Sequence, residues 1–181
     1  MGRSEGLRVV AIADADSFLK WSASLLGGVT GIRPHVLVVQ TPLTASVEQQ
    51  RTALAGAGIL TDDVTRLEFA QAAAWLERQR PDVVLLAGRG PFVRLLGRVT
   101  DALTHRPVVV AGLPGMAIPA QRGALEYRRH ADLLVVHSHR EARAFADLGR
   151  RIGVQMPTAL ATLPFARARS RMLAPERARV L

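Results

Sequence analysis

The sequence predicts a doubly wound, parallel α/β sheet of the Rossmann type. Short apolar runs recur about every 25 residues, and a stretch with helical periodicity follows each one. The runs show little polar alternation, which is typical of strands covered on both faces. We expect about five to seven strands in one Rossmann-like domain over residues 1–163, followed by an arginine-rich tail over residues 164–181.

The amino-terminal unit has a clear strand and a clear helix. Residues 7–13 (LRVVAIA) form the first predicted strand, which runs into the polar sequence DADS at residues 14–17. Phe18, Trp21 and Leu25 then recur at helical spacing and predict a helix with one apolar face.

The next part of the chain is less regular. Residues 35–39 (HVLVV) predict the second strand, and a capping box at Ser46 opens the second helix. A third strand is only weakly indicated, over residues 58–60. Thr65 and Glu68 have the spacing of another capping box, so we expect the following helix to start there.

The carboxyl-terminal half contains three more strands. They are predicted over residues 82–87 (DVVLLA), 108–111 (VVVA) and 133–136 (LLVV), and residues 154–163 add at most one short strand. The first two end in the glycine loops Gly88-Arg89-Gly90 and Gly112-Leu113-Pro114-Gly115. The third meets His137, after which Ser138 and Glu141 form a capping box that predicts a helix.

These exits define the predicted site, because parallel strands all end at one edge and ligands bind there in open α/β sheets. We expect the polar exit residues to converge into one pocket for an anionic or hydroxyl-rich ligand, and the opposite edge to hold no comparable polar set. The candidate general bases are His139, Asp16 and His137, since histidine titrates near neutrality and a carboxylate can accept a proton. The expected ligand contacts are Asp14, Ser17, Gly88, Gly90, Gly112, Gly115, Ser138 and Arg140.

Each candidate also has a purely structural interpretation. Asp16 or Ser17 could cap the first helix, and the glycines could serve tight turns alone. His137 and His139 could be partly buried loop residues held by backbone carbonyls. The pair Asp14 and Asp16 also resembles the aspartates of haloacid dehalogenase phosphatases, but no lysine follows Lys20 and no acidic pair closes a later strong strand.

Composition excludes several classes of protein. The chain has no cysteine, and two histidines without a third ligand make a weak metal site, so we expect no metal. Neither a Walker loop nor GxGxxG is present, and we expect no cofactor. The positive charge comes almost wholly from arginine, and nearly half of the net charge of +9 lies in the tail, so nucleic-acid binding is not expected. No apolar run could span a bilayer, so we expect a cytoplasmic protein.

Four segments resemble the amino-terminal half of an actinobacterial family of proposed glycosyltransferases, a domain of unknown function. They are VVAIADADSFLKW, RPDVVLLAGRGPFV, VVVAGLPGMAIPAQRGALEYRRHADLLVVHSHREARAF and ALATLPF, and they extend from about Leu7 to Phe165. The positions that match its recognisable motifs are residues 14–17, 112–115 and 137–140.

The resemblance implies the two-domain GT-B architecture, in which the amino domain binds the acceptor and the carboxyl domain binds the nucleotide-sugar. This sequence ends where the second domain would begin, so we expect the chain to be inactive alone. The expected partners are a small-molecule acceptor and either a separate carboxyl-terminal half or a second copy of the chain. The competing hypothesis is a binding module, in which the same crevice holds a small molecule or a protein without turnover.

Overall fold

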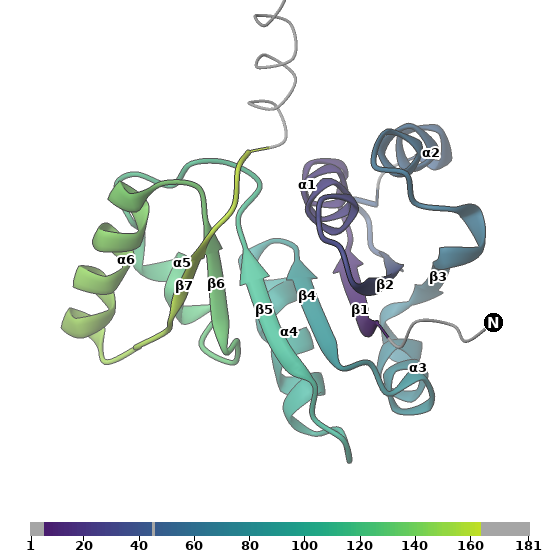
Figure 1. Cartoon of the computed structure of the whole chain (residues 1–181). Coiled ribbons are helices and arrows are strands. Elements are labelled where there is room, and N and C mark those ends of the chain that lie inside the picture. Colours follow the sequence, from purple (N-terminus) through teal and green to yellow (C-terminus); the bar gives the residue numbers. More distant parts are fainter. Residues whose placement is uncertain (1–5, 45, 164–181) are drawn as a thin grey trace, which may run out of the picture.

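The computed structural model describes residues 6–44 and 46–163, which form one sheet of seven strands flanked by helices (Figure 1). The strands are β1 (Leu7–Ala13), β2 (Ile32–Gln40), β3 (Val64–Glu68), β4 (Val83–Ala87), β5 (Val108–Gly112), β6 (Leu133–Val136) and β7 (Thr158–Leu160). Their order is β3-β2-β1-β4-β5-β6-β7, and every pairing is parallel. The predicted Rossmann-like fold is confirmed. The arginine-rich tail lies outside the described residues.

Helices connect successive strands. The α-helices are α1 (Asp16–Gly27), α2 (Val47–Gly56), α3 (Ala72–Gln79), α4 (Gly90–Asp101), α5 (Arg122–Glu126) and α6 (His139–Ile152), and two short 3-10 helices are η1 (Thr61–Asp63) and η2 (Phe69–Gln71). Within the described ranges, no helix is both long enough and apolar enough to cross a membrane.

The strands bury side chains on both faces, which explains their continuous apolar sequences. On β1, Val9, Ala11 and Ala13 pack in one core with α1 and α2, whereas Val10 and Ile12 pack in another with α3 and α4. Buried side chains of α5 and α6 pack against β6 in a third cluster. The helices that lead toward β3 therefore cover one face, and those that lead toward β7 cover the other, as right-handed crossovers require.

The third strand corrects the prediction from sequence. It covers Val64–Glu68 rather than residues 58–60, and Thr65 lies inside it rather than capping a helix. As an edge strand, β3 is only partly covered, and its sequence VTRLE contains three polar residues. A search for continuous apolar runs therefore does not detect it. The capping box of this segment instead joins Glu68 to Gln71, at the start of η2.

Candidate functional site

The order of the strands reverses between β1 and β4, and the two strands turn into helices on opposite faces of the sheet. In open α/β sheets, ligands bind at such a switch point, in the crevice outside the carboxyl edge where the strands end. The loop after β1 places Asp14 there, and the loop after β4 places Gly88 and Arg89 there. The candidate site is built around these residues.

Asp14 is the most unusual residue of the crevice. Its exposed fraction is 3%, and its Oδ1 atom has no hydrogen-bond partner among the described residues. This oxygen points across the switch point, since a Cβ added to Gly88 would lie 3.3 Å from it. Burial raises the pKa of the carboxyl, and the opposing effects of Arg89 and of nearby backbone N–H groups are smaller. Asp14 can therefore accept a hydrogen bond, and then a proton, from a ligand.

Asp16 and Ser17 do not cap α1. Ala15 occupies the N-cap position, and no side chain there bonds the first turn. Asp16 is the first helical residue, and its Oδ2 atom pairs with Lys20 at 2.6 Å. Its Oδ1 atom is the other buried side-chain atom without a partner in the described part of the chain, so Asp16 can still contribute one oxygen. Ser17 is exposed.

Three of the predicted glycines permit close packing. A Cβ on Gly88 would overlap the Phe92 ring, one on Gly90 the Tyr127 ring, and one on Gly112 the Trp21 ring. Gly115, the fourth predicted glycine, has no atom within 4 Å of the position that a Cβ would occupy. The loops thus bring aromatic rings against the backbone at the carboxyl edge.

His137 has a structural role at this edge. Its Nδ1 atom lies 2.8 Å from the Ala161 carbonyl, and its Nε2 atom lies 2.8 Å from the Leu113 carbonyl. The ring ties the exits of β5, β6 and β7 together, and neither nitrogen is free to act as a base.

Glu141 also connects the loops at this edge. Only one of the two bonds of the predicted capping box between Ser138 and Glu141 is formed. The Ser138 hydroxyl accepts a bond from the Glu141 N–H at 3.1 Å and so caps α6. The Glu141 carboxylate, which is 1% exposed, accepts bonds from the N–H groups of His137 (2.9 Å) and Ala117 (2.7 Å). Its role is to hold the long loop after β5.

His139 and Arg140 are exposed in the first turn of α6, and their side chains make no hydrogen bond with other described residues. Their strand, β6, lies three strands from β1, so about 14 Å separates the two exits at the usual spacing of a sheet. The structure therefore brings Asp14, Asp16, Gly88 and Gly90 together at the switch point. It places the residues after β5 and β6 in a second group.

Arg128 is a residue of this edge that the sequence did not indicate. It is 3% exposed, and its guanidinium donates to the carbonyls of Gly88 (3.1 Å), Gly112 (3.3 Å) and Ala124 (3.2 Å). No described carboxylate pairs with it, and burial lowers its pKa to about 10. The one signal in the sequence was its spacing of three residues from the buried Leu125, which separates it from the exposed Arg129.

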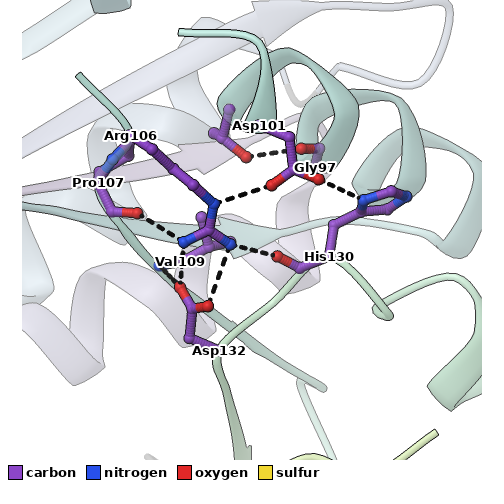
Figure 2. A network of polar contacts seen from close by, with 8 residues as sticks. Gly97, Asp101, Arg106, Pro107, Val109, His130 and Asp132 are labelled. Atoms are coloured by element: carbon purple, nitrogen blue, oxygen red, sulfur yellow. Dashed lines mark hydrogen bonds and ion pairs between the residues drawn. The ribbon is translucent and has the colours of Figure 1, made fainter. Parts of the chain in front are cut away.

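The opposite edge also differs from expectation, because it carries the densest polar network among the described residues. Figure 2 shows Arg106 between two carboxylates, bonding Asp132 at 2.8 and 3.0 Å and Asp101 at 2.9 Å. The Nδ1 atom of His130 lies 2.6 Å from Asp101. The prediction of no comparable polar set was wrong, because these residues lie in separate connections that only the fold brings together. Their carboxylates are all occupied by partners, so the network is structural.

Comparisons with known proteins place the chain in a family. Among solved structures, leucoanthocyanidin reductase with NADPH from Vitis vinifera is similar, with 17% identity, a TM-score of 0.41 and coverage of 85% of this chain. The chain spans about half (49%) of that reductase. No curated protein matches the chain. The model of the family described as "Putative glycosyltransferase (DUF6716)" matches residues 9–181, so the chain belongs to this family, as its motifs predicted.

Proposed function

We propose that this chain is the acceptor-binding domain of a glycosyltransferase, and that Asp14 binds and deprotonates the acceptor hydroxyl. The observation that carries the proposal is the buried Asp14 carboxyl, whose Oδ1 atom has no partner and points across the switch point. Membership of the family supplies the class of reaction. The raised pKa supplies a stronger base than an ordinary aspartate.

In this mechanism the acceptor oxygen attacks the anomeric carbon of an activated sugar. The hydroxyl proton moves to the Asp14 carboxylate, and the bond between the anomeric carbon and the leaving group breaks with its electrons on the leaving group. Asp16 offers its one unpaired oxygen beside Asp14, and the exposed His139 and Arg140 can contact distal parts of the acceptor.

The sugar donor must be held opposite this crevice. The described residues form a single sheet with one switch point, which the acceptor occupies in this proposal. A second unit, either a carboxyl-terminal half or another copy of the chain, would bind the donor and position it for attack. The chain alone should therefore not transfer sugar.

A non-catalytic binding module is the second candidate. It is favoured by the contacts of His137, because both ring nitrogens of this predicted base lie against backbone carbonyls. In such a module the Asp14 carboxylate would anchor a ligand without accepting a proton. A phosphatase-like use of Asp14 and Asp16 is less suitable, because Lys20 already pairs with Asp16.

The test is release of the nucleoside diphosphate from UDP- and GDP-sugars, with a mixture of hydroxylated acceptors. The purified chain alone should not exceed a boiled control, whereas adding the donor-binding half should give turnover. Asp14→Asn should then lower turnover by about 10²- to 10⁴-fold, the range of a general base. The matched Asp16→Asn variant should cost much less.

Turnover by the chain alone would disprove the split between two units. An equal loss in both variants would remove Asp14 from its special role. Ligand binding that depends on Asp14, without turnover in any combination, would support the binding module.

A further inference from the structure

The helices that begin at the carboxyl edge are capped in two different ways. Ser46 and Ser138 cap α2 and α6 by accepting a bond from the third helical N–H. In contrast, α1 and α4, the two helices at the switch point, have no side-chain cap. The first turn of α1 contains Asp16, whereas the first turn of α4 contains no acidic residue.

The start of α4 is therefore an unsatisfied group of donors. No hydrogen bond within the described residues uses the N–H of Gly90 or Phe92, and Pro91 between them has none. Such N–H groups, aligned with the helix dipole, attract an anion. The capped helices α2 and α6 lack this feature, whereas α3 and α5 are uncapped as well.

Two arginines add positive charge at this helix start. Arg128 donates to the Gly88 carbonyl, two residues before α4 begins, and no described carboxylate neutralises it. Arg89 occupies the N-cap position with an exposed side chain. Asp14 lies opposite them, and its unpaired Oδ1 atom needs a donor rather than an anion. The second carboxylate at the switch point, Asp16, is paired with Lys20.

We propose that the ligand of this crevice carries both an oxyanion and a hydroxyl. The oxyanion, a phosphate or a carboxylate, accepts bonds from the first turn of α4 and from Arg89, and the hydroxyl donates to Asp14. The inference deepens the proposed function, because it gives the acceptor a chemical class: a hydroxylated anion. Two arginines and a helix N-terminus supply positive charge beside Asp14, and the carboxylate of Asp16 is already paired with Lys20. This balance favours such a ligand over a neutral one.

The test uses small probes and the isolated chain, with binding followed by backbone amide NMR at low, constant ionic strength. The probes are inorganic phosphate, acetate, glycerol and glycerol 3-phosphate. Phosphate or acetate should shift the amides of Gly90 and Phe92 and leave the capped first turns of α2 and α6 unchanged. Saturation by phosphate alone assigns a phosphate group, and saturation by acetate alone assigns a carboxylate.

Variants separate the two halves of the ligand. Arg89→Gln should weaken binding of the anion by about two- to fivefold, the usual range for an exposed charge. Arg98→Gln, the control on the last turn of the same helix, should have no effect. Asp14→Asn should keep or strengthen binding of inorganic phosphate, because it removes a negative charge, yet abolish the additional affinity of glycerol 3-phosphate over phosphate.

The proposal is overturned if neither anion saturates these amides, or if Arg89→Gln and Arg98→Gln behave alike. It is also overturned if glycerol 3-phosphate gains no affinity over phosphate in the unaltered chain. Its failure differs from failure of the proposed function. If Asp14 is required for transfer to neutral acceptors and no anion binds, the proposed function stands and the anion site does not. If the anion binds but no sugar is transferred, the anion site stands and the proposed function does not.

Discussion

The two edges of the sheet use their aspartates in opposite ways. At the amino edge, Asp82 precedes β4 and Asp132 precedes β6, and each makes the same two bonds to the neighbouring strand. The N–H of Asp82 donates to the Arg8 carbonyl (3.0 Å), and its carboxylate accepts the Arg8 N–H (2.7 Å). Asp132 does the same with Val109, at 2.7 Å for both bonds. At the carboxyl edge, Asp14 directly follows β1 and leaves one buried oxygen unpaired.

This contrast separates residues that stabilise the fold from residues that are available to a ligand. A buried polar atom without a partner costs about 1 to 3 kcal/mol of stability. Such groups are concentrated at functional sites, where activity rather than stability selects them. Substitution of Asp132 and substitution of Asp14 should therefore change stability in opposite directions.

The largest effect is expected from Asp132→Ala at the amino edge. The carboxylate accepts two bonds from Arg106 and one from the Val109 N–H, and all three are lost. We expect the free energy of unfolding to fall by about 2 kcal/mol, a value reduced by solvent because 40% of the Asp132 side chain is exposed. Urea denaturation would measure it. The exposed Asp62, which makes no hydrogen bond with other described residues, provides the control Asp62→Ala, with almost no expected effect.

The same variant has a defined pH dependence. Burial raises the pKa of Asp132, but its bonds from Arg106 and Val109 outweigh burial and lower it overall. A carboxyl with a lowered folded-state pKa stabilises the protein above its unfolded value of about 3.9, and this contribution is lost as the pH falls through the folded value. The difference between Asp132→Ala and the parent should therefore shrink in acid. A difference that stayed constant down to about pH 2 would contradict the assignment.

A smaller effect of opposite sign is expected from Asp14→Asn. Because burial raises the pKa of Asp14, its ionised form destabilises the fold above that pKa, and the penalty disappears as the pH falls below about 3.9. The amide should raise the free energy of unfolding at pH 7 by about 1 kcal/mol, as is common when a functional carboxylate is removed. The gain should vanish near pH 3, in the same urea experiment. A loss of stability at pH 7 would show that Asp14 is a structural residue.

The fold was predictable because a strand that is buried on both faces consists of consecutive apolar residues. Runs such as LRVVAIA and DVVLLA are apolar because both of their faces pack against helices, and a single sequence shows this. The edge strand β3 has no such constraint, so its sequence VTRLE resembles a loop and a cap. Its position became visible only through pairing with β2, which is a contact between distant residues.

The candidate site was predictable only in part, for a related reason. Asp14 could be identified because a polar residue directly after a buried strand must lie at the carboxyl edge. The structural use of His137 depends on carbonyls 24 residues away in either direction, which no local pattern records. The partners of Arg128 and Arg106 are likewise distant in the chain.

The smallest expected effect tests whether the uncapped start of α4 lowers stability but allows an anion to bind. Arg89 has the extended backbone angles of an N-cap residue (φ −68°, ψ 157°), so a serine there could accept the Phe92 N–H as Ser138 accepts that of Glu141. Arg89→Ser should raise the free energy of unfolding by about 0.5 kcal/mol, in the range of a new cap. Ser138→Ala should lower it by a comparable or slightly larger amount.

The decisive measurement is phosphate affinity of the same variant. Arg89→Gln removes only the charge, whereas Arg89→Ser removes the charge and also occupies the Phe92 N–H, so the serine variant should bind phosphate more weakly than the glutamine variant. Thermal unfolding with and without phosphate reports both quantities, because a ligand that binds only the native state stabilises it by RT ln(1 + c/Kd) at a free ligand concentration c. If serine stabilises α4 while phosphate still binds as it does to Arg89→Gln, the first-turn N–H groups do not hold the anion. The uncapped helix would then be a defect of the fold rather than a part of the site.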